Sequence, residues 1–302
     1  MKLELKPEFI EKYKTLTDFK EFETIINTPL RKCIRINTLK KSVEEIKKQL
    51  EYLNLKSIPW FKEGFFVESE EKTLGNLYEH KVGYIFVQEA ASMIPPVILD
   101  PKKEDTILDA CAAPGSKSTQ IAQMINNQGI IIANDKTTSR IKALSANMQR
   151  MGVTNTIITI SDVRKISHPF TKILLDAPCS STGTIRGFNQ KTIKTVKTYK
   201  PNLIKSIAGI QKNLIKHAYG ILEPKGTLVY STCSLEPEED EGIIQHLLES
   251  TSAKLERPDL KIKSQINLEY DKEYSSELKK CIKLWPQVYD TQGFFIAKIR
   301  KP

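Results

Sequence analysis

The sequence has no long apolar run. None of its hydrophobic stretches approaches the roughly 18 uninterrupted residues that a membrane-spanning helix needs. The N-terminal segment, which begins Met1-Lys-Leu-Glu-Leu-Lys, also lacks the apolar core of a signal peptide. We therefore expect a cytoplasmic protein with no membrane partner. Its 302 residues, 40% of them hydrophobic, are enough for one large domain and a smaller one.

Cysteine and histidine are scarce and scattered. The five cysteines are an odd number without short pairing, so they predict reduced thiols rather than a disulfide framework: Cys33, Cys111, Cys179, Cys233 and Cys281. The four histidines are equally dispersed. Neither residue type shows metal-ligand spacing, and we expect no metal.

Acidic residues are absent from residues 177–222, although the same stretch has many basic residues. A solvated helix face usually mixes both signs of charge, which form ion pairs along the helix. With a formal net charge of +10, this single-sign stretch favours a phosphate-binding surface. We expect RNA contacts from Arg186, Lys194, Lys197 and Lys200.

The order of predicted elements divides the chain in two. Residues 1–95 predict a mixed α+β module, with helical patterning at 7–26, strands at 33–38, 65–67 and 84–87, and a helix over 42–53. Ser42 followed by Glu45 is a capping-box pattern for that helix. The prolines Pro95 and Pro96 suggest the boundary to a second domain, residues 96–302.

The second domain alternates short strands with helical segments. We expect strands at residues 106–109, 130–133, 156–160, 172–176, 226–231 and 293–298. Such alternation predicts a doubly wound, mostly parallel α/β sheet, whose ligands lie beyond the carboxyl ends of the strands.

Three acids follow three successive strands of this sheet. Asp109 leads into a turn of small residues, Asp135 is suited to accept the hydroxyls of a ribose, and Asp162 could accept a proton from an exocyclic amine. One such Asp is often only a helix cap, but three at successive strand ends describe a site for an adenosine-containing cofactor.

The fourth and fifth strands are each followed by a cysteine, Cys179 and Cys233. A free cysteine is often only a small buried hydrophobe, but two at neighbouring strand ends favour chemistry. Carbon 5 of cytosine becomes nucleophilic only after a nucleophile adds to carbon 6, and a thiolate performs that addition reversibly. Asp176, which ends the fourth strand, is placed to assist at the base's amino group and ring nitrogen.

At these residues the sequence resembles the RNA 5-methylcytosine methyltransferases of the Nol1/Nop2/Sun family. The resemblance covers nearly the whole chain and rests on residues 29–40, 87–93, 109–115, 133–135 and 293–295, with both cysteine motifs. It implies a seven-stranded Rossmann-like methyltransferase sheet that binds S-adenosyl-L-methionine. It also implies an N-terminal domain similar to an RNA-recognition motif that helps to hold RNA, with contacts from Arg31, Lys32 and Arg35.

The resemblance also implies roles for single residues. Cys233 corresponds to the family's nucleophile and Cys179 to its product-release residue, an order that spacing alone leaves open. Asp176 and Arg140 would line the reaction site. The remaining cofactor-binding positions would be Ala112, Ala113, Pro114, Gly115, Lys117, Asp135 and Asp162. The chain differs from the family pattern at Ser116, at Gly187-Phe188, and at Asp240, where the family commonly has asparagine.

Two other functions compete with this interpretation. Methylation of an amino group would favour an Asp/Asn-Pro-Pro-aromatic turn after the fourth strand, where this chain has Cys179. A non-catalytic RNA-binding assembly factor would be favoured by loss of either cysteine or of Asp135, and all three are present. Among RNA substrates we expect tRNA, with ribosomal RNA as the alternative, and we expect a monomer.

Overall fold

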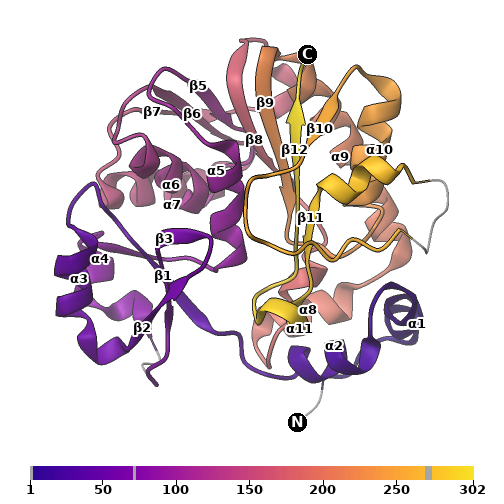
Figure 1. Ribbon diagram of the computed structural model, residues 1–302, viewed down its shortest axis with the longest axis horizontal. Helices are drawn as coiled ribbons and strands as arrows, with labels where there is room; N and C mark the ends of the chain where they lie inside the picture. Colours follow the sequence, from indigo (N-terminus) through magenta and orange to yellow (C-terminus); the bar gives the residue numbers. More distant parts are fainter. Residues whose placement is uncertain (1–2, 71–72, 269–273) are drawn as a thin grey trace.

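The structure is a computed structural model that describes residues 3–70, 73–268 and 274–302. Figure 1 shows a small sheet near the N-terminus beside a large sheet with helices on both faces. Within the described residues, no helix is both long enough and apolar enough to cross a membrane.

The small sheet is antiparallel, with strand order β2-β3-β1-β4. The helix after β1 begins with the predicted capping box, since the side chains and backbone amides of Ser42 and Glu45 hydrogen bond reciprocally. The strand order and connections match those of an RNA-recognition motif, as the family resemblance implies. Its elements are β1 (Lys32–Ile36), α3 (Val43–Gln49), η1 (Glu51–Leu53), β2 (Leu55–Ile58), β3 (Phe61–Val67), η2 (Leu74–Asn76), α4 (Tyr78–Lys81) and β4 (Ile85–Val87).

Both faces of the small sheet are covered. One face packs with α3 around Ile34 and Phe65, and the other buries Phe66 against Met93 and Ile94, which belong to η3 (Ala91–Met93) and α5 (Ile94–Leu99). An RNA-recognition motif stacks bases on exposed aromatic side chains of its sheet. Because Phe66 is only 6% exposed here, this sheet does not offer RNA that open platform.

Arg35 joins the small sheet to α6 (Ser116–Met124). Its guanidinium donates to Gln88 Oε1 at 2.9 Å, to Thr119 Oγ1 at 2.7 Å and to Gln123 Oε1. The side chain is fully buried, as a charged group can be when its donors are satisfied. The expectation that Arg35 contacts RNA is therefore wrong, because its donors are used inside the protein.

The helical pattern predicted for residues 7–26 corresponds to two separate helices in the structure, α1 (Pro7–Leu16) and α2 (Phe19–Ile26). Asp18 breaks the pattern by capping α2, since its side chain accepts from the amides of Lys20 and Glu21. Both helices pack against the second domain rather than the small sheet: Phe9 lies 5.0 Å from Tyr199 between ring centroids.

The large sheet has strand order β10-β12-β9-β8-β5-β6-β7, and β11 pairs with β12 to make eight strands. The pairs among β5 to β9 are parallel, which confirms the predicted doubly wound arrangement. The strands are β5 (Thr106–Asp109), β6 (Ile130–Asp135), β7 (Thr156–Ile160), β8 (Phe170–Asp176), β9 (Leu222–Thr232), β10 (Lys254–Glu256), β11 (Ile282–Leu284) and β12 (Phe294–Arg300).

Helices cover this sheet on both faces. Ile98 of α5 and Ile121 of α6 pack on one face, and Ile215 of α9 and Ile243 of α10 pack on the other. Pro95 and Pro96, the predicted boundary, lie in the first turn of α5. The remaining elements are α7 (Thr138–Met151), η4 (Val163–Lys165), η5 (Thr182–Thr184), α8 (Gln190–Thr198), α9 (Pro201–Gly220), α10 (Glu241–Ser250), η6 (Ser276–Lys280) and α11 (Pro286–Tyr289).

Candidate active site

The two strand-end cysteines lie side by side. Parallel pairing sets Asp176 of β8 opposite Ser231 of β9, and the loops that follow place the sulfur atoms of Cys179 and Cys233 3.4 Å apart. The amide of Gly183 donates to the carbonyl of Cys233 at 3.0 Å and holds the two loops together. The structure therefore brings together the pair that the sequence places only at neighbouring strand ends.

One hydrogen bond makes the two thiols unequal. Donation from Cys179 lowers the pKa of Cys233 to about 7; burial opposes this shift and the nearby Ser181 hydroxyl supports it. The same hydrogen bond, followed by burial, raises the pKa of Cys179 well above its ordinary value. Near neutral pH the arrangement therefore pairs a Cys233 thiolate with a protonated Cys179.

Asp176 is fixed beside the cysteines by two neighbours. Its carboxylate pairs with Lys117 Nζ at 2.7 Å and accepts from the Ser231 hydroxyl at 2.7 Å. Burial acts to lower the pKa of Lys117, but the neighbouring Asp176, Asp109 and Cys233 together outweigh burial and the pKa is raised. Lys117, expected to contact the cofactor, instead reaches the site through Asp176.

A cavity of about 480 Å³ opens at the carboxyl ends of these strands and contains both cysteines. Ala113, Asp135, Arg140, Asp162 and Asp176 line it, as the sequence predicts. Its described lining does not include Ala112, Pro114, Gly115 or Lys117. Ala112, Pro114 and Gly115 belong to the turn before α6, and Lys117 lies in the first turn of that helix. A side chain at Gly115, whose φ is +102°, would meet Leu144 at 2.9 Å.

The acids at the cavity already hold its loops in place. Asp135 is 3% exposed, accepts from the amides of Ala113 at 3.2 Å and Thr137 at 2.9 Å, and pairs with Arg140 at 3.1 Å. Asp162 binds the guanidinium of Arg164 at 2.9 and 2.6 Å, and these hydrogen bonds hold its pKa well below the ordinary range.

Apolar residues from other elements complete the cavity. Val163 of η4 and Ile210 and Leu214 of α9 form a wall that the sequence analysis missed, because nothing in α9 indicates which turn meets the strand ends. The carboxylates can accept hydrogen bonds from the hydroxyls of a ribose and from an amino group, and the apolar wall can pack against a purine. This combination suits an adenosine-containing cofactor. The described residues contain no cluster of three His, Cys, Asp or Glu side chains able to hold a metal.

The basic residues expected to contact RNA divide into two groups. Arg186 is 1% exposed, donates to the carbonyls of Thr291 at 3.0 Å and Pro29 at 3.1 Å, and pairs with Asp290 at 2.7 Å. Its assignment to RNA is therefore wrong, because it holds three segments of the protein together. Arg31 is half-buried and paired with Glu68, Lys32 is half-buried, and the exposed basic residues are Lys194, Lys197 and Lys200.

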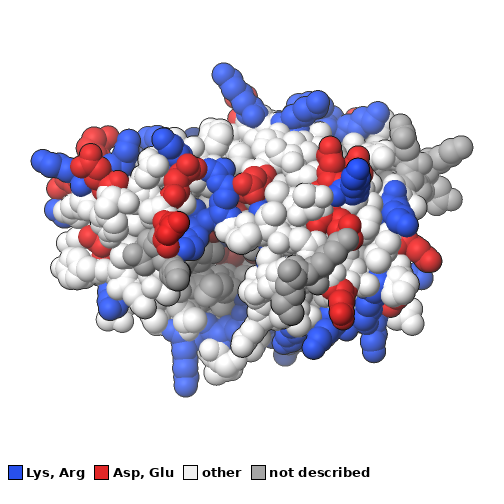
Figure 2. All heavy atoms as spheres, turned by 90° about the horizontal axis from the view of Figure 1, so that it is seen from below, with Lys and Arg blue, Asp and Glu red and all other residues white. Residues whose placement is uncertain are grey.

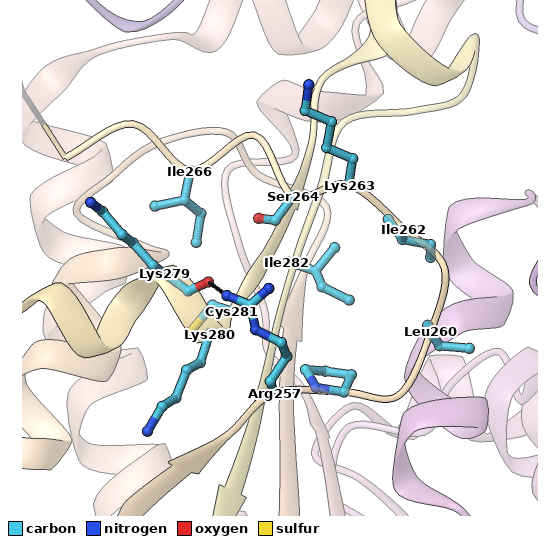
Figure 3. Close-up of a pocket in the computed structure, with 11 residues that line it drawn as sticks. Arg257, Leu260, Ile262, Lys263, Ser264, Ile266, Lys279, Lys280, Cys281 and Ile282 are labelled. Atoms are coloured by element: carbon cyan, nitrogen blue, oxygen red, sulfur yellow. Dashed lines mark hydrogen bonds between the residues drawn. The ribbon is translucent and has the colours of Figure 1, made fainter.

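A second cavity, of about 300 Å³, lies between residues 257–266 and 279–282. Figure 3 shows the amino groups of Lys263, Lys279 and Lys280 directed away from it. The residues lining it include no carboxylate, and burial raises the pKa of Cys281 well above its ordinary value. The cavity near the two cysteines is therefore the candidate site.

Comparison with known families gives two matches. Residues 96–300 match the model described as 16S rRNA methyltransferase RsmB/F. Residues 5–90 match the N-terminal domain of 16S rRNA methyltransferase RsmF.

Individual relatives cover nearly the whole chain. A tRNA (cytosine(49)-C(5))-methyltransferase from Pyrococcus abyssi is 45% identical over 97% of this chain and 95% of its own length. Ribosomal RNA small subunit methyltransferase F from Shewanella woodyi is 42% identical, but the chain spans 60% of its length. Among solved structures, a methyltransferase homolog from Pyrococcus horikoshii, 36% identical, has a TM-score of 0.84 over 99% of this chain and 100% of its own. NSun6 from the same organism, solved with SFG and 26% identical, has a TM-score of 0.86 over 98% of both chains.

Replacing Asp135 with alanine tests the cofactor pocket. We expect S-adenosylmethionine to bind about tenfold to hundredfold more weakly, because its ribose hydroxyls would lose a buried acceptor. Isothermal calorimetry measures the affinity, and thermal unfolding shows whether the variant is folded. Equal affinity in a folded variant would remove Asp135 from the pocket.

Alkylation tests the inequality of the thiols. Because the pKa of Cys233 is lowered to about 7, it is a protonated thiol below that pH and a thiolate above it. Its reaction with iodoacetamide, followed by peptide mass spectrometry, should therefore rise through pH 7, well before Cys179 reacts. In Cys179→Ala the donor is gone, so the midpoint for Cys233 should move to higher pH. An unmoved midpoint would show that Cys179 does not control Cys233.

Proposed function

The chain belongs to the RsmB/F family of RNA 5-methylcytosine methyltransferases, the NOP2/Sun family, and within this family we propose that its substrate is tRNA. It is an S-adenosylmethionine-dependent enzyme that methylates carbon 5 of cytosine in RNA. The tRNA assignment is supported by 45% identity, over nearly the full length of both chains, with an enzyme named for cytosine 49 of tRNA. We place the reaction in the cytoplasm.

Ribosomal RNA is the second candidate substrate. Both matching family models are named for 16S rRNA enzymes, and the Shewanella woodyi relative at 42% identity is named as a methyltransferase of small-subunit ribosomal RNA. The chain spans only about 60% of that relative, so the likeness concerns part of the ribosomal RNA enzyme.

We assign the attack on the base to Cys233. Its thiolate would add to carbon 6 of cytosine, forming a carbon–sulfur bond and making carbon 5 nucleophilic. The lowered pKa of Cys233 supports this role, because it supplies thiolate near neutral pH. S-adenosylmethionine, when bound, supplies the methyl group.

Cys179 would act in the second half of the reaction. There the Cys179 sulfur, in its deprotonated form, would take the proton from carbon 5. The electron pair of that bond re-forms the double bond between carbons 5 and 6, and the bond between carbon 6 and the Cys233 sulfur breaks, which regenerates the Cys233 thiolate. Once Cys233 is bonded to the base, it no longer carries the negative charge that its thiolate places 3.4 Å from Cys179. The pKa of Cys179 should then fall, so that it can take part in proton transfer.

Asp176 and the basic surface would bind the substrate. Asp176, held by Lys117 and Ser231, faces the same cavity as the cysteines and suits the amino edge of cytosine. The positive charge of Lys191 on α8 contributes to lowering the pKa of Cys233, which is consistent with a basic surface that begins near the site. Lys194, Lys197 and Lys200 extend that surface for contacts with phosphates. Figure 2 shows many lysine and arginine side chains along both long edges of the face seen from below Figure 1, with acids and further basic side chains between the edges.

Methylation of defined transcripts tests the substrate. We expect transfer of labelled methyl groups to unmodified tRNA, with bisulfite sequencing locating one cytosine, and little transfer to 16S rRNA fragments. Single-residue replacement of that cytosine by uridine is the control. Faster methyl transfer to ribosomal RNA than to tRNA at equal concentration would make ribosomal RNA the favoured substrate.

Covalent trapping tests the roles of the cysteines. Both Cys233→Ala and Cys179→Ala should abolish turnover, but they should fail at different steps. Because Cys179→Ala retains the nucleophile, it should accumulate an enzyme–RNA complex that survives denaturing electrophoresis, and Cys233→Ala should form none. Trapping only in Cys233→Ala would exchange the roles. Full activity of either variant would exclude a two-cysteine mechanism.

A further inference from the structure

Three consecutive acids at the start of α10 have fully buried side chains. Glu239, Asp240 and Glu241 are each 0% exposed. A buried carboxylate is costly unless hydrogen bonds or a cation satisfy it. The partners of each acid therefore indicate what this acidic turn, residues 239–241, does in the protein.

Two of the acids share a cation. Lys283 Nζ lies 3.1 Å from Asp240 and 2.8 Å from Glu241, and it comes from β11. Side chains alternate along a strand, so Lys283 faces the acidic turn and its neighbour Ile282 lines the cavity of Figure 3. This ion-pair cluster anchors the turn without help from Glu239.

Asp240 also contacts the strand that ends at Cys233. The hydroxyl of Thr232, the residue before Cys233, donates to Asp240 Oδ1 at 2.6 Å. The position is an acid where the family commonly has asparagine, and Lys283 supplies the compensating charge. The turn is thus fixed relative to the Cys233 strand.

Glu239 binds the other cysteine loop. Its carboxylate accepts from the amide of Ser180 at 2.9 and 3.2 Å and from the Ser180 hydroxyl at 2.6 Å. Ser180 directly follows Cys179. The Ser180 hydroxyl also lies 3.3 Å from that of Ser234, which directly follows Cys233.

These contacts are specific to the cysteine loops. Within the described chain, no Lys or Arg pairs with the Glu239 carboxylate, whereas Asp240 and Glu241 share Lys283. Burial raises the pKa of Glu239, and hydrogen bonds from Ser180 and Ser234 oppose the rise. The side chain is therefore satisfied by the residues that follow the two cysteines.

We propose that Glu239 is a positioning residue for Cys179: through Ser180 it fixes the Cys179 loop at the distance from Cys233 that release of the methylated base requires. The inference rests on the two-cysteine mechanism proposed above. Asp240 holds the Cys233 strand through Thr232, and Glu239 adds only its hydrogen bond with Ser234 on that side, whereas the amide and the hydroxyl of Ser180 both depend on Glu239. Loss of the Glu239 carboxylate should therefore affect adduct release more than adduct formation.

Glu239→Gln tests the proposal with little change of volume. A glutamine amide is neutral and has an NH2 donor in place of one carboxylate oxygen, so the hydrogen bonds from Ser180 lose their charged acceptor and one oxygen that faces the Ser180 donors becomes a donor itself. We expect turnover on the RNA substrate to fall about tenfold to hundredfold, as for loss of a hydrogen bond to a charged group. The covalent enzyme–RNA complex should accumulate as in Cys179→Ala, with its rate of formation and S-adenosylmethionine affinity within about twofold of wild type.

The control is Glu238→Gln, in the residue before, whose carboxylate pairs with Lys12 and not with either cysteine loop. It should have wild-type turnover and no accumulated complex. Ser180→Ala removes the hydroxyl but keeps the backbone amide, so it should lose less turnover than Glu239→Gln while accumulating the same complex. The double variant should lose less than the sum of the two single losses, because both changes act on the contact between Ser180 and Glu239. Additive losses would overturn the proposal.

Two other outcomes would also overturn it. Glu239→Gln could form and release the complex at wild-type rates, or it could lose both steps equally together with a lower melting temperature. Measurements on the wild-type enzyme distinguish failure of the positioning role from failure of the two-cysteine mechanism. A wild-type enzyme that forms its transient complex while Glu239→Gln is unaffected overturns the positioning role alone. A wild-type enzyme that methylates without any complex overturns the two-cysteine mechanism, and the positioning role with it.

Discussion

In the parallel register of β8 and β9, Asp176 lies opposite Ser231, and each strand continues into a loop with one cysteine. A shift of this register by one residue would turn the side chains of one strand to the other face of the sheet. Asp176 would then lose the Ser231 hydroxyl, and the 3.4 Å separation of the sulfur atoms would not be kept. The helices packed on both faces fix the register, so the core and the chemistry depend on the same pairing.

Contacts far apart in the sequence support the loop after Cys233. Glu236, which is fully buried, pairs with Lys12 at 2.7 Å and accepts from the Tyr13 hydroxyl at 2.8 Å, both on α1. The N-terminal helices thus pack against the active-site loops. The face of the small sheet that an RNA-recognition motif would leave open is buried here against α5 and α6. The N-terminal segment therefore contributes to the shape of the site, and the exposed lysines of α8 remain the surface that we propose for phosphates.

The sequence predicts local features of this fold well. β5 and β7 have the predicted bounds, and Asp135 and Asp162 line the cavity because strand ends in a parallel sheet share one edge. The failures concern long-range partners. Arg35 and Arg186 look like RNA contacts because basic residues are usually exposed, but their acceptors, such as Gln123 and Thr291, are distant in sequence. Ile210 and Leu214 were missed because helix periodicity identifies a buried face but not which turn meets a ligand.

The order of the two cysteines is a further point that spacing cannot decide. In the sequence each is a thiol after a strand, so the roles came from family resemblance. In the structure the two sulfur atoms share one hydrogen bond, so one cysteine donates it and the other accepts it. The surrounding groups favour Cys233 as the acceptor. The Ser181 hydroxyl and, more weakly, Lys191 favour the Cys233 thiolate against burial and the Asp176 carboxylate, whereas the buried carboxylate of Glu239 disfavours a charge on Cys179. The acid that holds the Cys179 loop therefore also helps to keep that thiol protonated, so positioning and electrostatics favour the same division of roles.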